Sequence, residues 1–200
     1  MDLAEPSAAE ELARSLREPR SPLLFVASGR PILGAPAVEA LLAHPYPVAG
    51  LLLRPVRGPW AEALLACDLL WGGPGTLLRF PPGGVWPALL SLRVGAVGAA
   101  RVAFAGGALS FAEAFQAGWC RAAPAARDEA LAVGERLFTS HSPGALRLLR
   151  PLLYRERGLA AAGALALERH AFALAWELPD AKEGVAGFLE KRPLRFRTAR

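Results

Sequence analysis

The sequence predicts an α/β protein in which short buried strands come first and a helical layer closes the chain. Apolar runs of strand length, bounded by proline, glycine or arginine, occur at residues 22–29, 46–54 and 68–71. From residue 88 onward, apolar residues recur at helical spacing instead. Strands near the start and helices near the end are typical of an α/β core followed by helices.

The helices are predicted from the spacing of apolar residues and from signals at their ends. In the first helix, Ser7 suits the N-cap and Glu10 follows three residues later, as in a capping box. Residues 72–87 contain too many glycines and prolines for a helix or a strand, so we expect a loop there. The predicted helices span residues 6–18, 36–45, 61–68, 88–104, 110–119, 126–140, 143–158 and 160–178, with short helices closing the chain.

The composition is that of a folded protein with one sizeable core. The 200 residues are 53% hydrophobic, which argues against disorder. The net charge of +5 comes almost wholly from arginine, and four arginines lie in residues 192–200. Such a tail can meet nucleic acid or a phosphorylated ligand. Because no basic stripe with interleaved aromatics accompanies it, we expect no nucleic-acid partner.

The cysteines and the apolar segments exclude two further classes of protein. Cys67 and Cys120 lie far apart and form no metal-binding spacing, so we expect no metal site. Every apolar segment of membrane-spanning length contains a charge, a proline or a cluster of glycines. The first residues are acidic and helical rather than basic and apolar, unlike a signal peptide. We therefore expect a cytoplasmic protein with no membrane partner.

Residues 57–71, RGPWAEALLACDLLW, place a single glutamate just after a Gly-Pro-Trp sequence. Pro59 suits the first position of a helix, where its missing N–H costs little. Glu62 then complements the positive N-terminus of that helix. On these residues alone, the segment is interpreted as an ordinary helix start.

Four longer blocks resemble the enoyl-CoA hydratase/isomerase (crotonase) family. Residues 165–196 contain DAKEG and FLEKR after an aromatic-ended helix, as in the closing segment of that family. Residues 109–119, LSFAEAFQAGW, are similar to its L-S-A-x-E-A-x-x-x-G-L. Residues 45–70 match its P-K-P-V-I-A-A-V-N-G-x-A-x-G-G-G-x-E-L-A-L-A-C-D without a gap, and residues 23–36 match V-V-L-T-G-x-G-x-A-F-S-A-G-A-D one residue short. The blocks occur in the family's order and cover most of the chain.

The resemblance implies a spiral of strand-strand-helix units over residues 1–137, shortened at its N-terminus. A helical oligomerisation region would follow over residues 138–200, with trimers or hexamers as the assembly. Family members are lyases and isomerases of fatty-acid metabolism that bind acyl-CoA thioesters, and no other cofactor is implied. Two backbone N–H groups hold the thioester oxygen as negative charge develops on it, and two glutamates move protons.

The first catalytic glutamate and one oxyanion donor are assigned by the match. Glu62 takes the position of the first catalytic glutamate. Pro59 occupies the position of the second oxyanion-hole donor, and proline has no N–H to give. Trp60 replaces a further glycine and can fill space that a thioester would need. The N–H of Leu33, followed by Gly34, matches the first donor, although an ordinary tight turn explains these residues equally well.

The second glutamate has no counterpart. A gap-free comparison puts Pro82 in its place, a gapped one deletes the position, and no acid occurs between Asp68 and Glu113. Hydration by two carboxylates is therefore unsupported.

Two C-terminal residues match positions that contact coenzyme A in the family. Phe172 can pack on adenine, and Lys191 can meet a phosphate as a point charge. The alternatives are a core aromatic for Phe172 and a solvated side chain for Lys191.

The sequence thus leaves three functions open. The first is an enoyl-CoA hydratase/isomerase-like protein with a degenerate site, in which ordinary hydratase activity is weak or absent. The second is a non-catalytic structural or regulatory subunit that assembles with itself or with an active relative. The third, weaker, function is acyl-CoA binding without turnover.

Overall fold

A computed structural model describes residues 22–26, 35–81, 86–124, 126–155 and 161–196. The chain divides into two compact units, and the main change from one to the other lies between Gly134 and Glu135. The predicted first helix at residues 6–18 lies outside the described residues.

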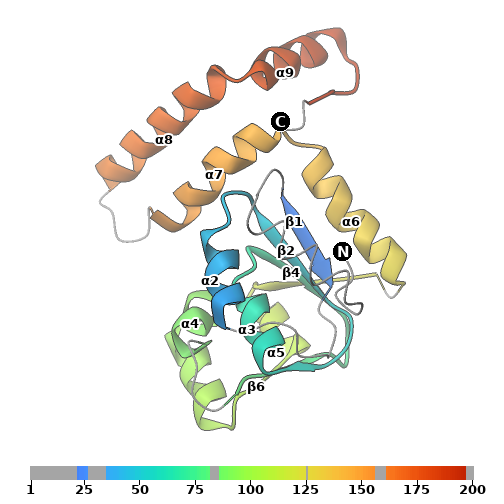
Figure 1. Cartoon of the computed structure of the whole chain (residues 1–200), viewed down its shortest axis with the longest axis vertical. Coiled ribbons are helices and arrows are strands. Elements are labelled where there is room, and N and C mark those ends of the chain that lie inside the picture. The colour runs from blue at the N-terminus through green and yellow to red at the C-terminus, as the bar shows by residue number, and fades with distance from the viewer. Residues whose placement is uncertain (1–21, 27–34, 82–85, 125, 156–160, 197–200) are drawn as a thin grey trace. The chain divides into compact units, whose positions relative to one another are not determined.

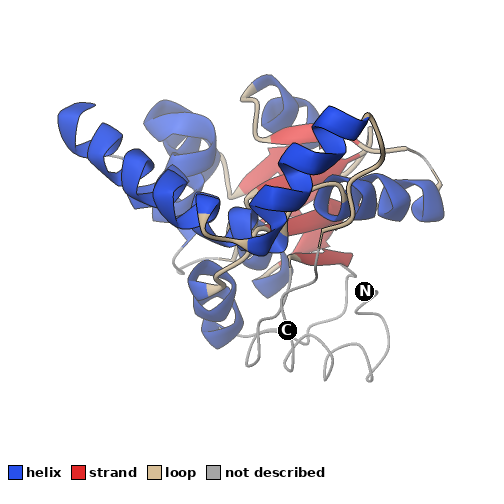
Figure 2. Cartoon of the chain, turned by 90° about the horizontal axis from the view of Figure 1, so that it is seen from above, coloured by secondary structure: helices blue, strands red, loops and turns tan. Residues whose placement is uncertain are grey.

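The N-terminal unit contains two small sheets and the helices between their strands (Figure 1). The first sheet is entirely parallel in the order β1-β2-β4-β7, and the second has the order β3-β5-β6, with β5 and β6 antiparallel. Figure 2 shows these strands gathered as one group. The described elements of this unit are β1 (Leu23–Val26), α2 (Ala35–Ala43), β2 (Val48–Leu52), β3 (Val56–Arg57), α3 (Pro59–Leu65), β4 (Leu69–Gly72), β5 (Leu77–Arg79), α4 (Trp86–Phe104), β6 (Ala108–Ser110), α5 (Phe111–Gln116) and β7 (Cys120–Ala122). The next helix, α6 (Arg127–Thr139), has its first residues in this unit and its last residues in the second.

The chain passes repeatedly from one sheet to the other. β2 in the first sheet is followed by β3 in the second and then by α3, and β4 is followed by β5 and then by α4. This strand-strand-helix order confirms the predicted α/β fold class. It also brings the start of α3 directly after β3, where the candidate catalytic glutamate stands.

The prediction of a loop over residues 72–87 is wrong. β5 lies inside this segment and pairs with both β3 and β6, and α4 already begins at Trp86. The rings of Phe80 and Trp86 stack with centroids 5.0 Å apart, and Trp86 Nε1 donates to the carbonyl oxygen of Pro81 at 2.8 Å. Strand pairing and this aromatic contact therefore override the composition of the segment.

Helix α3 packs closely against strand β2. A Cβ atom added at Gly50 would lie 2.5 Å from a methyl group of Leu64 and 3.0 Å from the sulfur of Cys67. All residues of α3 from Trp60 to Leu65 are buried, and they belong to the main hydrophobic core except for Glu62. Glycine at position 50 is therefore what lets α3 approach the sheet.

Helix α4 is long and apolar enough, by length and composition alone, to cross a membrane. Gly95 has φ 76° and ψ 164°, so the helix is divided into two pieces. Leu90 and Val102, one on each side of this kink, are fully buried in the core of the N-terminal unit. Trp86 and Ala99 are the other residues of α4 in that core, and most of the helix surface is not buried.

The second unit contains α7 (Pro143–Arg155), α8 (Ala161–Trp176) and α9 (Pro179–Glu190). Ser142 caps α7, because its hydroxyl oxygen accepts the N–H of Ala145 at 3.3 Å. The same hydroxyl donates to Asp180 Oδ2 at 2.6 Å, and both side chains are buried. The aspartate of the DAKEG block therefore ties the start of α9 to the start of α7.

Candidate active site

Glu62 stands in the first turn of α3 and is only 8% exposed. Its backbone N–H donates to the carbonyl oxygen of Gly58 at 3.3 Å, and the N–H of Ala61 donates to the same oxygen at 3.0 Å. The carboxylate therefore belongs to a buried helix start, where the helix dipole favours negative charge.

The residues before Glu62 keep the backbone of a helix start but lack one donor. Gly58 is the N-cap, with φ 63° and ψ −136°, a conformation essentially confined to glycine. Its N–H donates to the carbonyl oxygen of Arg79 at 2.9 Å, which fixes the turn on β5. Pro59 follows at the first helical position, so the N–H that a helix normally directs outward there is missing. The ring of Trp60 is 1% exposed and belongs to the hydrophobic core.

The other predicted oxyanion residues, Leu33 and Gly34, lie outside the described residues, and so does Pro82 at the place of the second glutamate. Helix α2 begins at Ala35, directly after Gly34. The structure therefore leaves the assignment of Leu33 as a prediction.

Glu113 is the first acid after Asp68 in the sequence, and it has a structural role. It forms a capping box with Ser110 at the start of α5, accepting the Ser110 N–H at 2.7 Å. It also pairs with Arg101 at 2.6 Å. The Ser110 N–H, helped by the Ser110 hydroxyl and by Arg101, lowers the pKa of this carboxyl. Glu113 is thus held as a carboxylate and is a poor donor of a proton to substrate.

Asp68, the last residue of the ACD sequence, joins two strands of the parallel sheet. Its Oδ2 accepts the backbone N–H of Val48 at 2.6 Å, and its own N–H donates to the carbonyl oxygen of Val48 at 2.8 Å. This reciprocal pair extends the contact between β2 and β4 beyond their ladder. Asp68 therefore fixes the end of the segment that carries Glu62.

The two predicted coenzyme A contacts lie in the second unit and are both exposed. Phe172 on α8 is 67% exposed and stacks on Trp176 with ring centroids 6.0 Å apart, so within a single chain it is not a core residue. Phe172 and Trp176 line a groove of about 980 Å³, together with residues of α7 and α9. Lys191 follows α9 and has φ 53°, a left-handed conformation unusual for a residue other than glycine.

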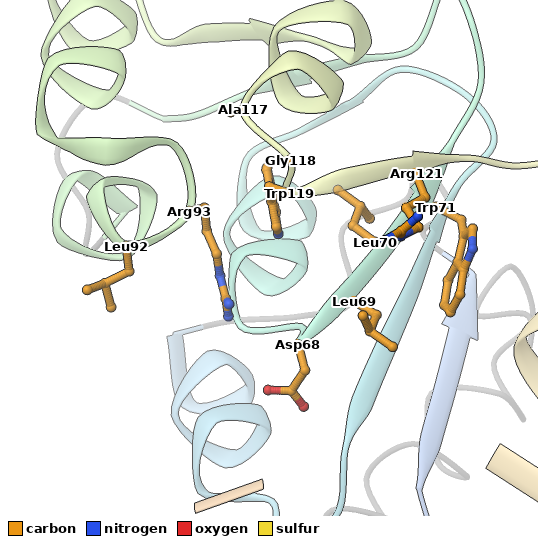
Figure 3. Close-up of a pocket in the computed structure, with 10 residues that line it drawn as sticks. All are labelled: Asp68, Leu69, Leu70, Trp71, Leu92, Arg93, Ala117, Gly118, Trp119 and Arg121. Atoms are coloured by element: carbon orange, nitrogen blue, oxygen red, sulfur yellow. The ribbon is translucent and has the colours of Figure 1, made fainter. Parts of the chain in front are cut away.

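Sequence reasoning missed a cavity of about 270 Å³ in the N-terminal unit, shown in Figure 3. It lies between β4, β7, the turn after α5, and α4. Its polar side chains come from Asp68, Arg93, Trp119 and Arg121. Since these residues come from separate elements, no local motif could have signalled the cavity.

No protein-family profile matches the chain. A protein of Bacillus subtilis (strain 168) named probable enoyl-CoA hydratase is 30% identical over an alignment of 176 residues, and the match covers 82% of this chain and 67% of that protein. An enoyl-CoA hydratase/isomerase from Mycobacterium paratuberculosis has a similar structure, with a TM-score of 0.81 and 18% identity over 98% of this chain and 93% of that one. An enoyl-CoA hydratase from Bacillus anthracis gives a TM-score of 0.77 and 19% identity, covering 98% and 90% of the two chains. The sequence relative and the shared fold agree with the four sequence blocks, and the chain belongs to the enoyl-CoA hydratase/isomerase (crotonase) superfamily.

Proposed function

We propose that the chain is an acyl-CoA-binding member of this superfamily whose hydratase activity is weak or absent. The observation that carries the proposal is Pro59 at the first position of α3, three residues before Glu62. In the family, the N–H at that position is one of two that hold the thioester oxygen. Removing one such donor lowers catalysis by about a hundred- to a thousandfold.

A single proton transfer is the chemistry that the remaining residues support. Glu62 would take a proton from the carbon next to the thioester carbonyl, and the resulting enolate oxygen would rely on the N–H of Leu33. The buried position of Glu62 supports this role, because a carboxylate shielded from water can act on a bound substrate rather than on solvent.

Water addition needs a second group to deliver or remove a proton. The sequence holds no Asp or Glu from residue 69 to residue 112, and the acid that follows, Glu113, is occupied by Ser110 and Arg101. We therefore assign the chain to enolate chemistry at a low rate rather than to hydration.

The test measures hydration of 2-enoyl-CoAs of short, medium and long chain by the wild type and by Glu62→Gln. We expect wild-type rates close to those of the variant. Hydration by the wild type that far exceeds that of Glu62→Gln would contradict the proposal. Calorimetric titration with CoA and with acyl-CoA tests ligand binding separately, and no heat from either would leave only the non-catalytic alternative.

The second candidate function is a structural or regulatory subunit, and exposed apolar side chains of the second unit favour it. Phe188 and Leu189 on α9 are 82% and 71% exposed, and Trp176 at the end of α8 is 59% exposed. Exposed apolar surface of this kind marks an interaction site. We propose a second copy of the chain as the occupant, because the family resemblance implies trimers built through this region.

Light scattering coupled to size-exclusion chromatography tests the assembly. We expect the wild type to elute as a trimer or a hexamer and Phe188→Asp to shift towards the monomer. Lys182→Glu is the matched control, since Lys182 is an exposed residue of the same helix and its change removes no apolar surface. A monomeric wild type would contradict this part of the proposal.

A further inference from the structure

The cavity of the N-terminal unit contains a buried hydrogen-bond donor, the indole N–H of Trp119. Trp119 is 8% exposed, and its Nε1 has no hydrogen-bond partner within the described part of the chain. Figure 3 shows the indole lying beside Arg93, with its nitrogen directed towards the Asp68 side of the cavity. A buried N–H without an acceptor costs free energy, so a group that brings an acceptor oxygen into the cavity is favoured.

The charged groups around the cavity favour an anion. Arg121 on β7 is exposed and has no ion-pair partner among the residues that the structure describes. Arg93 is held at the cavity by its Nε–H, which donates to the carbonyl oxygen of Leu65 at 2.9 Å. The carboxylate of Asp68 already accepts the N–H of Val48. The cavity is therefore lined by two guanidinium groups and by one carboxylate, which already accepts a hydrogen bond from Val48.

The remaining walls are apolar, which sets the kind of anion. Leu70 and Trp71 are buried parts of β4, and Leu92 on α4 exposes about half of its surface, 52%. A volume of about 270 Å³ lies below the range that holds drug-sized ligands, roughly 300–1,000 Å³. The cavity thus suits a ligand of a few heavy atoms with one charged end and one apolar end.

We propose that this cavity binds a short-chain monocarboxylate. One carboxylate oxygen accepts the Trp119 N–H, the anion is paired with Arg121, and the alkyl chain contacts Leu70. The cavity contains none of the residues assigned to thioester chemistry, so this binding site is independent of the function proposed above.

Butyrate is the probe, and the indole N–H signals of the ¹⁵N-labelled full chain are the readout. The chain has five tryptophans, and Trp119→Phe identifies the signal of Trp119 by its loss. We expect butyrate to move that signal downfield in a saturable way, with a dissociation constant on the order of 1–10 mM for so small a ligand. The indole signals of Trp60, Trp86 and Trp176, which lie outside the cavity, should stay in place.

Arg121→Gln should weaken butyrate binding by about five- to tenfold, because a charge-assisted contact is lost. Arg54→Gln is the matched control, since Arg54 is an exposed arginine of the same unit outside the cavity, and it should bind like the wild type. Butyramide, which is neutral, should bind more weakly than butyrate. The proposal is overturned by an unmoved Trp119 signal, by contact of that N–H with water only, by equal binding of butyramide, or by an unchanged affinity in Arg121→Gln.

Discussion

The carbonyl oxygen of Gly58 accepts the backbone N–H of Glu62 at 3.3 Å, which closes the first turn of α3 around Pro59. The turn has the shape of a helix start that could direct an N–H outward, and proline removes that N–H. The candidate base and the missing donor are thus parts of the same turn. This relationship is the basis of the proposed loss of hydratase activity.

Close packing of α3 on β2 predicts that Gly50→Ala destabilises the protein. The added Cβ would meet Leu64 and Cys67, both fully buried, at 2.5 and 3.0 Å. Overpacking of this kind costs about 1–3 kcal/mol, measured as the free energy of unfolding in urea. Gly73→Ala is the control, because nothing lies within 4 Å of its added Cβ, and it should be as stable as the wild type or slightly more so. Equal stability of the two variants would show that α3 does not pack as described.

The pairing of Asp68 with Val48 predicts a structural effect of changing this residue. Asp68→Ala leaves the N–H of Val48 without its side-chain acceptor and should lower the free energy of unfolding by about 1–3 kcal/mol. Asp68→Asn keeps an acceptor oxygen and should lose less. If the alanine and asparagine variants unfold at the same urea concentration as the wild type, Asp68 does not hold β2 and β4 together.

The ion pair between Glu183 and Arg192 predicts a change at acid pH. The Arg192 guanidinium, together with the N–H of Arg195, lowers the pKa of Glu183 from 4.5 to about 2. Since the pKa is lower in the folded chain, the contact stabilises the fold fully above pH 4.5 and is lost as the pH falls through about 2. The Arg195 N–H, which donates to Glu183 Oε1 at 2.8 Å, reports this directly.

In NMR spectra, the Arg195 amide signal should shift with a midpoint near pH 2. In Glu183→Gln the shift should vanish, and raised salt should move the midpoint upward because exposed charges are screened. A midpoint near the ordinary value of 4.5 would mean that Arg192 does not hold this carboxylate.

Both cysteines should resist thiol reagents in the folded protein. Cys67 and Cys120 are buried, and burial raises the pKa of Cys120 to about 12. Because the thiolate is the reactive form, reaction with a disulfide reagent at mildly alkaline pH should be slow until the chain is unfolded. Rapid labelling of either residue in the folded protein would show that its surroundings open readily.

The longer elements of the fold could be predicted from the sequence, and the shortest strands could not. β2 is a continuous apolar run of strand length, and α3 begins with a Gly-Pro sequence typical of a helix start, so both could be predicted. β3, β5, β6 and β7 have two or three residues each, too few for an alternating pattern. They exist because remote segments pair with them, as β5 does with β6. The many glycines and prolines of residues 72–87 therefore led to the prediction of a loop, although a strand lies inside the segment.

The candidate site could likewise be predicted from the sequence only in part. The position of Glu62 and the lost donor at Pro59 follow from one continuous block of sequence, and the structure places both in one turn. The cavity at Trp119 depends on packing between β4, α4 and β7, and neither spacing nor composition records that packing. The exposure of Phe172 likewise depends on how α8 packs rather than on its sequence.

The most direct test of the account is deuterium exchange at the carbon next to the thioester carbonyl of a 3-enoyl-CoA in D₂O. This step needs one base and the oxyanion donors but no second acid, so it isolates the effect of Pro59. We expect slow exchange by the wild type and faster exchange by Pro59→Gly, by up to about a hundred- to a thousandfold, because glycine restores an N–H at that position. The gain should disappear when Glu62→Gln is added to that variant. Fast exchange by the wild type with no gain in Pro59→Gly would contradict the claim that the missing N–H limits catalysis.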